Sequence, residues 1–145
     1  MNVKNFLSKE QQEAIVAAIE NAENATSGEV RVHIESSCKA DILDRTAQVF
    51  SDLKMHKTAL RNGVLIYLAV NDRKFAIIGD TGINSKVPTG FWDEIQTAMT
   101  SEFIKNEFAN GLIKGIEMVG EKLKTFFPVA DDDINELSNE ISFGS

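Results

Sequence analysis

Residues 61–79, RNGVLIYLAVNDRKFAIIG, determine the fold that the sequence predicts. The apolar run over residues 64–70 is unbroken and rich in β-forming side chains, which is typical of a central strand covered on both faces. Asn71 and Asp72 then form a tight-turn pair, so residues 74–78 are expected to return beside that run as the second strand of a hairpin.

The segments around this hairpin predict one further strand and four helices. Ser8, with Gln11 three positions later, has the pattern of a capping box and marks the start of the first helix. Residues 29–35 alternate apolar and polar side chains, so a half-buried strand is expected there, with His33 on its solvated face. The other helices are expected over residues 41–55, 91–103 and 112–123. This order predicts an α/β fold, in which helices flank a small mixed sheet.

The order of elements also predicts which strand ends meet. The strand over residues 29–35 and the run over residues 64–70 are joined by a helix, so they are expected to be parallel, with a right-handed crossover. Glu29, Asn62 and Asp80 should then share one rim of the sheet. The opposite rim stays open as an alternative, because open α/β sheets usually bind ligands at the carboxyl ends of their strands. That rim carries Ser36, Ser37, Asp41, Asn71 and Asp72.

Length and charge narrow the class of protein. The 145 residues suffice for one domain, and the net charge of −7 argues against nucleic acid as the main partner. Residues 129–145 hold five acids and no bases, so we expect a domain over residues 1–128 and a solvated acidic tail over residues 129–145. No signal peptide and no apolar run of about 20 residues is recognised, so a cytoplasmic monomer without membrane insertion is expected.

Three short motifs resemble known signatures but lack an essential part. The spacing between Cys38 and Arg45 is one residue too long for a cysteine-phosphatase loop. The single Asp-Thr-Gly triplet over residues 80–82 would need a second copy to form an aspartic-protease pair. Residues 131–140 lack the glycine and glutamate positions of an EF-hand calcium loop. His56 lies in a basic loop with Lys57 and Arg61, and an anion contact at this loop is an alternative to a merely exposed linker.

Asp80 and Asp93 are the strongest candidates for metal ligands. Asp80 follows a glycine at the end of a buried strand, and Asp93 lies in the first turn of a helix, where the helix dipole by itself also favours a carboxylate. With Glu29 or Asn62 on the same rim, these residues supply the hard oxygen ligands that Ca²⁺ and Mg²⁺ prefer.

Three segments, in this order, resemble the TPM domain family: residues 26–32 (TSGEVRV), 61–66 (RNGVLI) and 78–83 (IGDTGI). Residues 103–111 also resemble the closing segment of that family, and the resemblance covers most of residues 7–125. It implies a Rossmann-like α/β/α sandwich and, in some members, divalent-metal binding, often of calcium. Acid phosphatase activity is attributed to a plant member.

The resemblance also carries over site positions, and these are Asn62, Gly79, Gly82 and Asp93, with Asp80 adjacent. Two departures reduce the negative charge of that site. Arg61 stands where many members have an acid, and Asn84 stands where many have glutamate. Many members also carry a signal peptide and a membrane anchor, which are not expected here, so the chain resembles a cytoplasmic bacterial branch of the family.

Two functions follow from these observations. The first is a divalent-metal-binding protein, with Ca²⁺ or Mg²⁺ on the carboxylate rim and phosphate on Arg61, that hydrolyses phosphate monoesters. The second is a non-catalytic interaction domain with a structural metal or none, whose phenylalanine-rich last helices and acidic tail contact a protein partner. No residue stands out as a nucleophile, so no catalytic residue is assigned.

Overall fold

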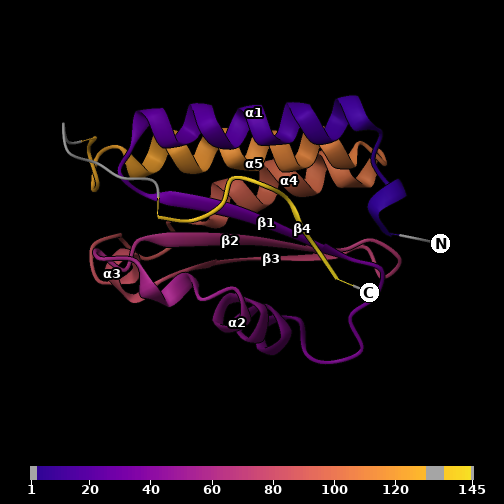
Figure 1. Cartoon of the computed structure of the whole chain (residues 1–145), viewed down its shortest axis with the longest axis horizontal. Helices are drawn as coiled ribbons and strands as arrows, with labels where there is room; N and C mark the ends of the chain where they lie inside the picture. Colours follow the sequence, from indigo (N-terminus) through magenta and orange to yellow (C-terminus); the bar gives the residue numbers. More distant parts are fainter. Residues whose placement is uncertain (1–2, 130–135, 145) are drawn as a thin grey trace.

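The computed structural model describes residues 3–129 and 136–144. Its centre is a four-stranded mixed sheet with the order β3-β2-β1-β4 (Figure 1). β1 (Glu29–Glu35) and β2 (Gly63–Ala69) are parallel, and β3 (Lys74–Gly79) returns antiparallel to β2. Both predicted strand pairings are therefore confirmed.

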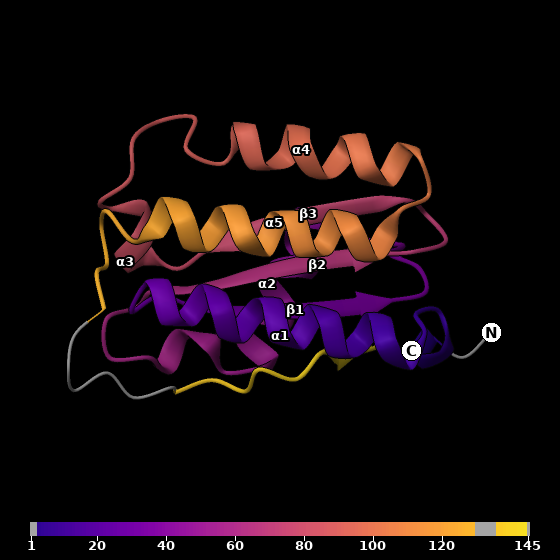
Figure 2. The same ribbon diagram turned by 90° about the horizontal axis from the view of Figure 1, so that it is seen from above.

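Helices cover the two faces of this sheet unequally. α1 (Lys9–Ala25), α4 (Asp93–Ile104) and α5 (Phe108–Leu123) lie on one face, and α2 (Ile42–Asp52) lies on the other (Figures 1 and 2). The result is the α/β/α sandwich that the resemblance implies. Three short helical turns complete the connections: η1 (Val3–Asn5), η2 (Met55–Lys57) and α3 (Thr81–Asn84).

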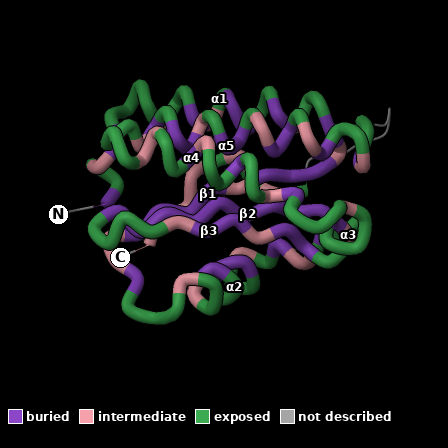
Figure 3. The backbone as a smooth tube through the Cα atoms, turned by 180° about the vertical axis from the view of Figure 1, so that it is seen from behind, coloured by how far each residue is buried: buried purple, intermediate pink, exposed green. Residues whose placement is uncertain are grey.

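β2 separates two hydrophobic cores, which explains its unbroken apolar sequence. Val64, Ile66 and Leu68 face the larger core under α1, α4 and α5. The alternate residues Leu65 and Tyr67 face a smaller core on the α2 side. Every residue of β2 is buried, as the buried central strands in Figure 3 show. The prediction of a central strand covered on both faces is confirmed.

Local signals account for the helix boundaries. The capping box at the start of α1 is confirmed, because the Gln11 amide N–H donates to Ser8 Oγ at 3.0 Å and the Ser8 amide N–H donates to Gln11 Oε1 at 2.9 Å. The predicted helix over residues 41–55 is shorter than expected. It ends at Asp52, because Lys54 adopts a left-handed conformation (φ 57°) that an α-helix cannot accommodate.

The end of the chain differs from the prediction of a solvated tail. Ser142–Phe143 forms β4, which pairs with β1 in parallel register, His33 opposite Ser142. Ile141 and Phe143 pack against the larger core, and this apolar contact holds the segment on the sheet. A strand of two residues has no sequence periodicity to detect. The acidic residues Asp131, Asp132 and Asp133 lie outside the described residues.

Candidate functional site

The starts of β1 and β2 and the end of β3 meet at one rim of the sheet, as predicted. Glu29 lies opposite Gly63 in the parallel ladder, and its amide N–H donates to the Asn62 carbonyl oxygen at 3.2 Å. The Asp80 amide N–H donates to the Gly63 carbonyl oxygen at 3.0 Å. Glu29, Asn62 and Asp80 are all buried. The topology therefore brings three of the four predicted metal ligands to the same edge.

Arg61 and Asp80 form a bidentate ion pair at this rim. Arg61 Nε donates to Asp80 Oδ2 and Arg61 Nη2 donates to Asp80 Oδ1, each at 2.8 Å. The Asp80 side chain is 4% exposed and that of Arg61 is 46% exposed. The hydrogen bonds to Asp80 raise the pKa of the Arg61 guanidinium, which therefore stays charged. Asp80 Oδ1 also accepts the Thr81 amide N–H at 2.7 Å, which caps the short helix α3.

Two glycines allow close packing at this rim. Arg61 itself has a left-handed backbone (φ 51°), and its carbonyl oxygen accepts the Gly82 amide N–H at 2.9 Å. A Cβ atom on Gly82 would lie 2.5 Å from the Arg61 carbonyl oxygen, so only glycine fits against this loop. A Cβ atom on Gly79 would lie 2.7 Å from the Trp92 ring, which packs over the end of β3.

A groove of about 330 Å³ opens between α2, α3 and the end of β3. Polar groups line it, including the exposed part of Arg61 and the half-buried His56, so the predicted basic loop does face an accessible hollow. The other lining residues are Ala47, Phe50, Ser51, Ile78, Gly79, Asp80, Thr81 and Asn84. This combination of an arginine, hydroxyl groups and an apolar wall suits a small organic anion.

Glu29 does not face this groove as a free ligand. Its Oε1 accepts the amide N–H groups of Glu136 and Leu137 at 2.5 and 2.7 Å, so the carboxylate holds the segment that leads into β4. Its negative charge acts on Glu23, whose Oε2 accepts the Val30 amide N–H at 3.1 Å. Burial, reinforced by Glu29, raises the pKa of Glu23 to about 7.

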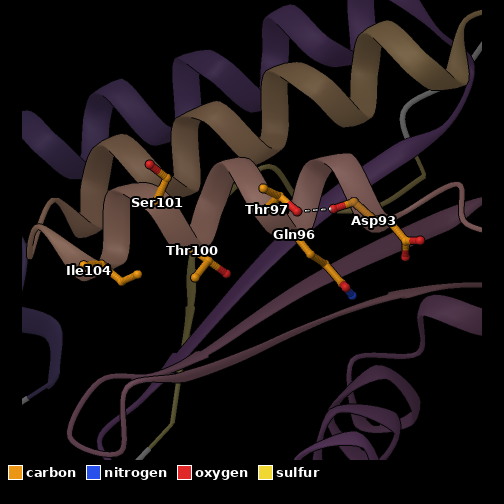
Figure 4. A pocket seen from close by; sticks show the side chains of 6 residues that line it. All are labelled: Asp93, Gln96, Thr97, Thr100, Ser101 and Ile104. Atoms are coloured by element: carbon orange, nitrogen blue, oxygen red, sulfur yellow. Dashed lines mark hydrogen bonds between the residues drawn. The ribbon is translucent and has the colours of Figure 1, made fainter.

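Asp93 lies in the first turn of α4, as predicted, but it lines a different hollow from Asp80. All the residues of that second hollow belong to α4 (Figure 4), and they are Asp93, Gln96, Thr97, Thr100, Ser101 and Ile104. Within residues 3–129 and 136–144, no three His, Cys, Asp or Glu side chains are grouped closely enough to hold a metal ion. The four predicted ligands are thus not arranged as a ready-made cation site.

Sequence reasoning missed a buried polar network on the α2 face of β1. His33 is buried, which contradicts the prediction of a solvated histidine. Its Nε2 lies 3.0 Å from Glu35 Oε1 and its Nδ1 lies 2.8 Å from Ser142 Oγ. Arg45 donates to both oxygens of Glu35, and Tyr67 Oη donates to Glu35 Oε2 at 2.5 Å. Arg45 is therefore committed to Glu35 and does not face a Cys38 phosphatase loop.

The charges of this network are set by burial and by hydrogen bonds. Burial raises the pKa of Glu35, but hydrogen bonds from Arg45, Tyr67 and His33 outweigh it and lower the pKa to about 2. Burial lowers the pKa of His33. Because an ionised Glu35 can only accept, His33 Nε2 carries the proton and Nδ1 accepts from the Ser142 hydroxyl. The signal in the sequence is the run of Arg31, His33 and Glu35 on one strand face, and alternation alone predicts that such a face is solvated.

The fold and the rim define an open-sheet α/β domain with a polar groove beside an arginine–aspartate pair. Comparison with known proteins shows the family: the TPM domain matches residues 1–122, and the chain belongs to the TPM domain family. No curated protein matches the chain. Within the described residues, no helix has the length and apolar character needed to cross a membrane.

Solved structures show the same fold. The chain is similar to the BA42 protein of the psychrophilic bacterium Bizionia argentinensis, at 50% identity over 96% of each chain, with a TM-score of 0.92. Two N-terminal domains share the fold at lower identity. That of cg2496 from Corynebacterium glutamicum is 21% identical over 79% of this chain and 72% of its own, with a TM-score of 0.65. That of a P. gingivalis protein is 22% identical over 83% and 78%, with a TM-score of 0.69.

Proposed function

We propose that the rim at Arg61 and Asp80 binds a phosphate monoester together with Ca²⁺ or Mg²⁺, and that hydrolysis of this ester is the activity to test. The observation that supports the proposal is the ion pair itself. Arg61 uses two N–H groups on Asp80, while nearly half of its side chain stays exposed beside a groove with room for a small ligand. A cytoplasmic location and a monomeric state belong to the same proposal.

The ion pair offers a way to bind both ligands without leaving a buried charge alone. When Arg61 moves from Asp80 to a phosphate, its planar guanidinium keeps two parallel hydrogen bonds. Asp80 is then left with one donor, the Thr81 amide, and its remaining oxygen sites become available to a cation. Each ligand therefore favours the rearrangement that admits the other, so the two should bind with positive coupling.

The other predicted ligands keep supporting roles in this proposal. Asn62 lies on the same rim, while Asp93 and Glu29 would each need to turn from their present surroundings. A divalent cation on Asp80 would polarise a phosphoryl oxygen or activate a water molecule. Arg61 would orient the phosphate, and His56 is the groove side chain placed to exchange a proton.

The test is an NMR titration of chelator-stripped protein with Mg²⁺, with and without phenyl phosphate. We expect saturable shifts at Thr81 and Arg61 and a higher Mg²⁺ affinity when phenyl phosphate is present. Asp80→Asn should remove both effects, whereas Asp44→Asn, a control with the same charge change at an exposed position of α2, should retain them. If Mg²⁺ and phenyl phosphate bind independently, Arg61 does not move from Asp80 to the phosphate as proposed. If no shift is saturable, the proposed metal site is wrong. Release of phosphate from phenyl phosphate then decides whether the site is catalytic.

A second candidate function, a non-catalytic interaction domain, is favoured by a different observation. An extended segment near the end of the chain lies along one edge of the sheet, and only two of its residues, Ser142–Phe143, pair with β1 as a strand. Sheet edges are common sites of peptide binding. If Mg²⁺ and phenyl phosphate leave the rim unchanged in the titration above, this second function becomes the better one.

A further inference from the structure

The outer edge of β1 carries a row of groups that contact residues 136–144 one after another. Glu29 Oε1 accepts the Glu136 and Leu137 amides, His33 Nδ1 accepts the Ser142 hydroxyl, and the Ile34 carbonyl oxygen accepts the Gly144 amide N–H at 2.9 Å. Figure 2 shows the segment, in yellow, following the sheet edge. We call the edge that carries these groups, Glu29–Glu35, the β1 edge.

The β1 edge and the residues beside it select particular side chains at both ends of the segment. Near its start, Leu137 packs against the smaller core, and its Cδ1 would lie 3.5 Å from a Cβ atom on Gly63. The Glu136 carboxylate accepts the Ala59 amide N–H at 3.2 Å. Near its end, a Cβ atom on Gly144 would lie 2.8 Å from the Glu35 carboxyl carbon, so glycine alone fits there.

Between these ends, the β1 edge favours an acidic residue. Among the described residues, Arg31 Nε is buried without a hydrogen-bond partner. Burial lowers the pKa of this guanidinium, and the negative charge of Glu140 opposes that effect. An acidic side chain at this point of a bound segment therefore lies near a half-buried guanidinium whose Nε has no hydrogen-bond partner among the described residues. The chemistry recognised is Glu-Leu at the start, an acid in the middle, and Ile-Ser-Phe-Gly at the end.

The segment is held loosely compared with the rest of the sheet. Each of residues 136–144 is exposed or only half-buried, and two of them form the strand. The match to the TPM domain ends at residue 122, before this segment begins. When the segment leaves, the backbone of β1 becomes an unpaired sheet edge, and such edges accept extended peptides.

We propose that the β1 edge is a peptide-binding site that accepts an extended segment of a partner protein, parallel to β1 and with the chemistry just described. Residues 136–144 occupy the site within the same chain and compete with that partner. Because the segment is tethered to the sheet, its effective concentration at the site is in the millimolar range. A partner peptide must therefore bind more tightly than the segment, or bind after the segment has been released from the sheet. This inference does not depend on the proposed phosphate and metal site.

The test uses the full chain with a weakened segment and an unmodified β1 edge. In the double variant Leu137→Asp/Gly144→Val, the selective contacts of Leu137 and Gly144 are lost. The probe is a fluorescent peptide with the sequence of residues 136–144, ELSNEISFG, and the control peptide carries the same two changes, EDSNEISFV. We expect the probe to bind the variant at least tenfold more tightly than the wild-type chain, with shifts at the amides of Val30, Val32 and Ile34. The control peptide should not bind.

Two outcomes would overturn the proposal. One is a variant that keeps its α1 and α5 amide signals and yet binds the probe no better than the wild-type chain. The other is dimerisation of the wild-type chain through exchange of this segment, which would make a second copy the occupant. A further measurement needs no variant: excess probe added to the wild-type chain should release Phe143 and Gly144, seen as sharp new amide signals. No release at several millimolar probe would also contradict the proposal.

Discussion

Gly82→Ala should destabilise the fold through a contact between backbones. The added Cβ atom would lie 2.5 Å from the Arg61 carbonyl oxygen and closer still to that of Leu60. Neither neighbour is the flexible end of a side chain, so the loop before β2 must move. That loop already contains Arg61 in a left-handed conformation, which leaves it little freedom to adjust.

The size of the effect follows from two opposing contributions. Forcing an extra methyl group into a packed site costs typically about 1–3 kcal/mol, and contact with backbone belongs at the upper end of that range. Gly82 lies in helix α3, where alanine is favoured over glycine by about 1 kcal/mol. The net loss should be about 2 kcal/mol, which lowers Tm by roughly 6 °C for a domain of this size.

Urea denaturation followed by circular dichroism measures this loss, with Gly63→Ala as the matched control. A Cβ atom on Gly63 meets its nearest neighbour at 3.4 Å, an ordinary van der Waals distance, so that variant should lose less stability than Gly82→Ala. In Gly82→Ala, the side-chain Nε–H signal of Arg61 should also shift, because the loop carries the ion pair. Equal stability of the two variants would refute the packing that holds Arg61 on Asp80.

Two further predictions concern pH and the buried network. Because burial raises the pKa of Glu23 to about 7, the folded chain binds its proton more tightly than the unfolded chain, so stability should fall as the pH rises from about 4.5 to 7. Glu23→Gln should flatten this part of a plot of urea midpoint against pH, and Glu13→Gln, on the same helix, should not. Because the pKa of Glu35 is lowered to about 2, its contribution to the free energy of unfolding is present above pH 4.5 and is lost as the pH falls toward 2. Tyr67→Phe removes a donor to this carboxylate and should cost about 1.5–3 kcal/mol at pH 7, with a smaller loss near pH 2.

The sequence was sufficient to predict three of the four strands, because their signals are local. The apolar run in β2 and the turn pair Asn71 and Asp72 define the hairpin, and the crossover rule then orients β1. β4 has no such signal, since Ser142 pairs with a strand more than one hundred residues earlier. His33 was misplaced for a related reason: alternation marks a polar face, but it does not show that Arg45 and Ser142 cover that face.

The sequence predicts at which rim of the sheet the candidate site lies, but it does not predict how the side chains of the site contact one another. Topology placed Arg61 and Asp80 at one rim, yet their ion pair depends on the left-handed backbone of Arg61 and on the close approach of Gly82. The prediction that Asp93 joins Asp80 comes from their places, at the end of a strand and in the first turn of a helix, together with the resemblance, and neither determines where that helix lies. In the structure the chain between them brings Trp92 against Gly79, and Asp93 lines the separate hollow of α4.

Glu29 connects the two proposals, because the same carboxylate is a predicted metal ligand and the anchor of the C-terminal segment. Its Oε1 already accepts two amide N–H groups, and a cation bound to that oxygen would have to displace them. A cation on Asp80 and Asn62 alone would leave the segment in place, whereas one that recruits Glu29 would loosen it. In the second case, the docked segment must lower the affinity for the cation by the same factor by which the cation weakens docking of the segment, because coupling between two binding events is reciprocal. The amides of Glu136 and Leu137 therefore distinguish the two cases in the Mg²⁺ titration: unchanged signals place the cation away from Glu29, and shifted signals make the peptide-binding edge responsive to the metal.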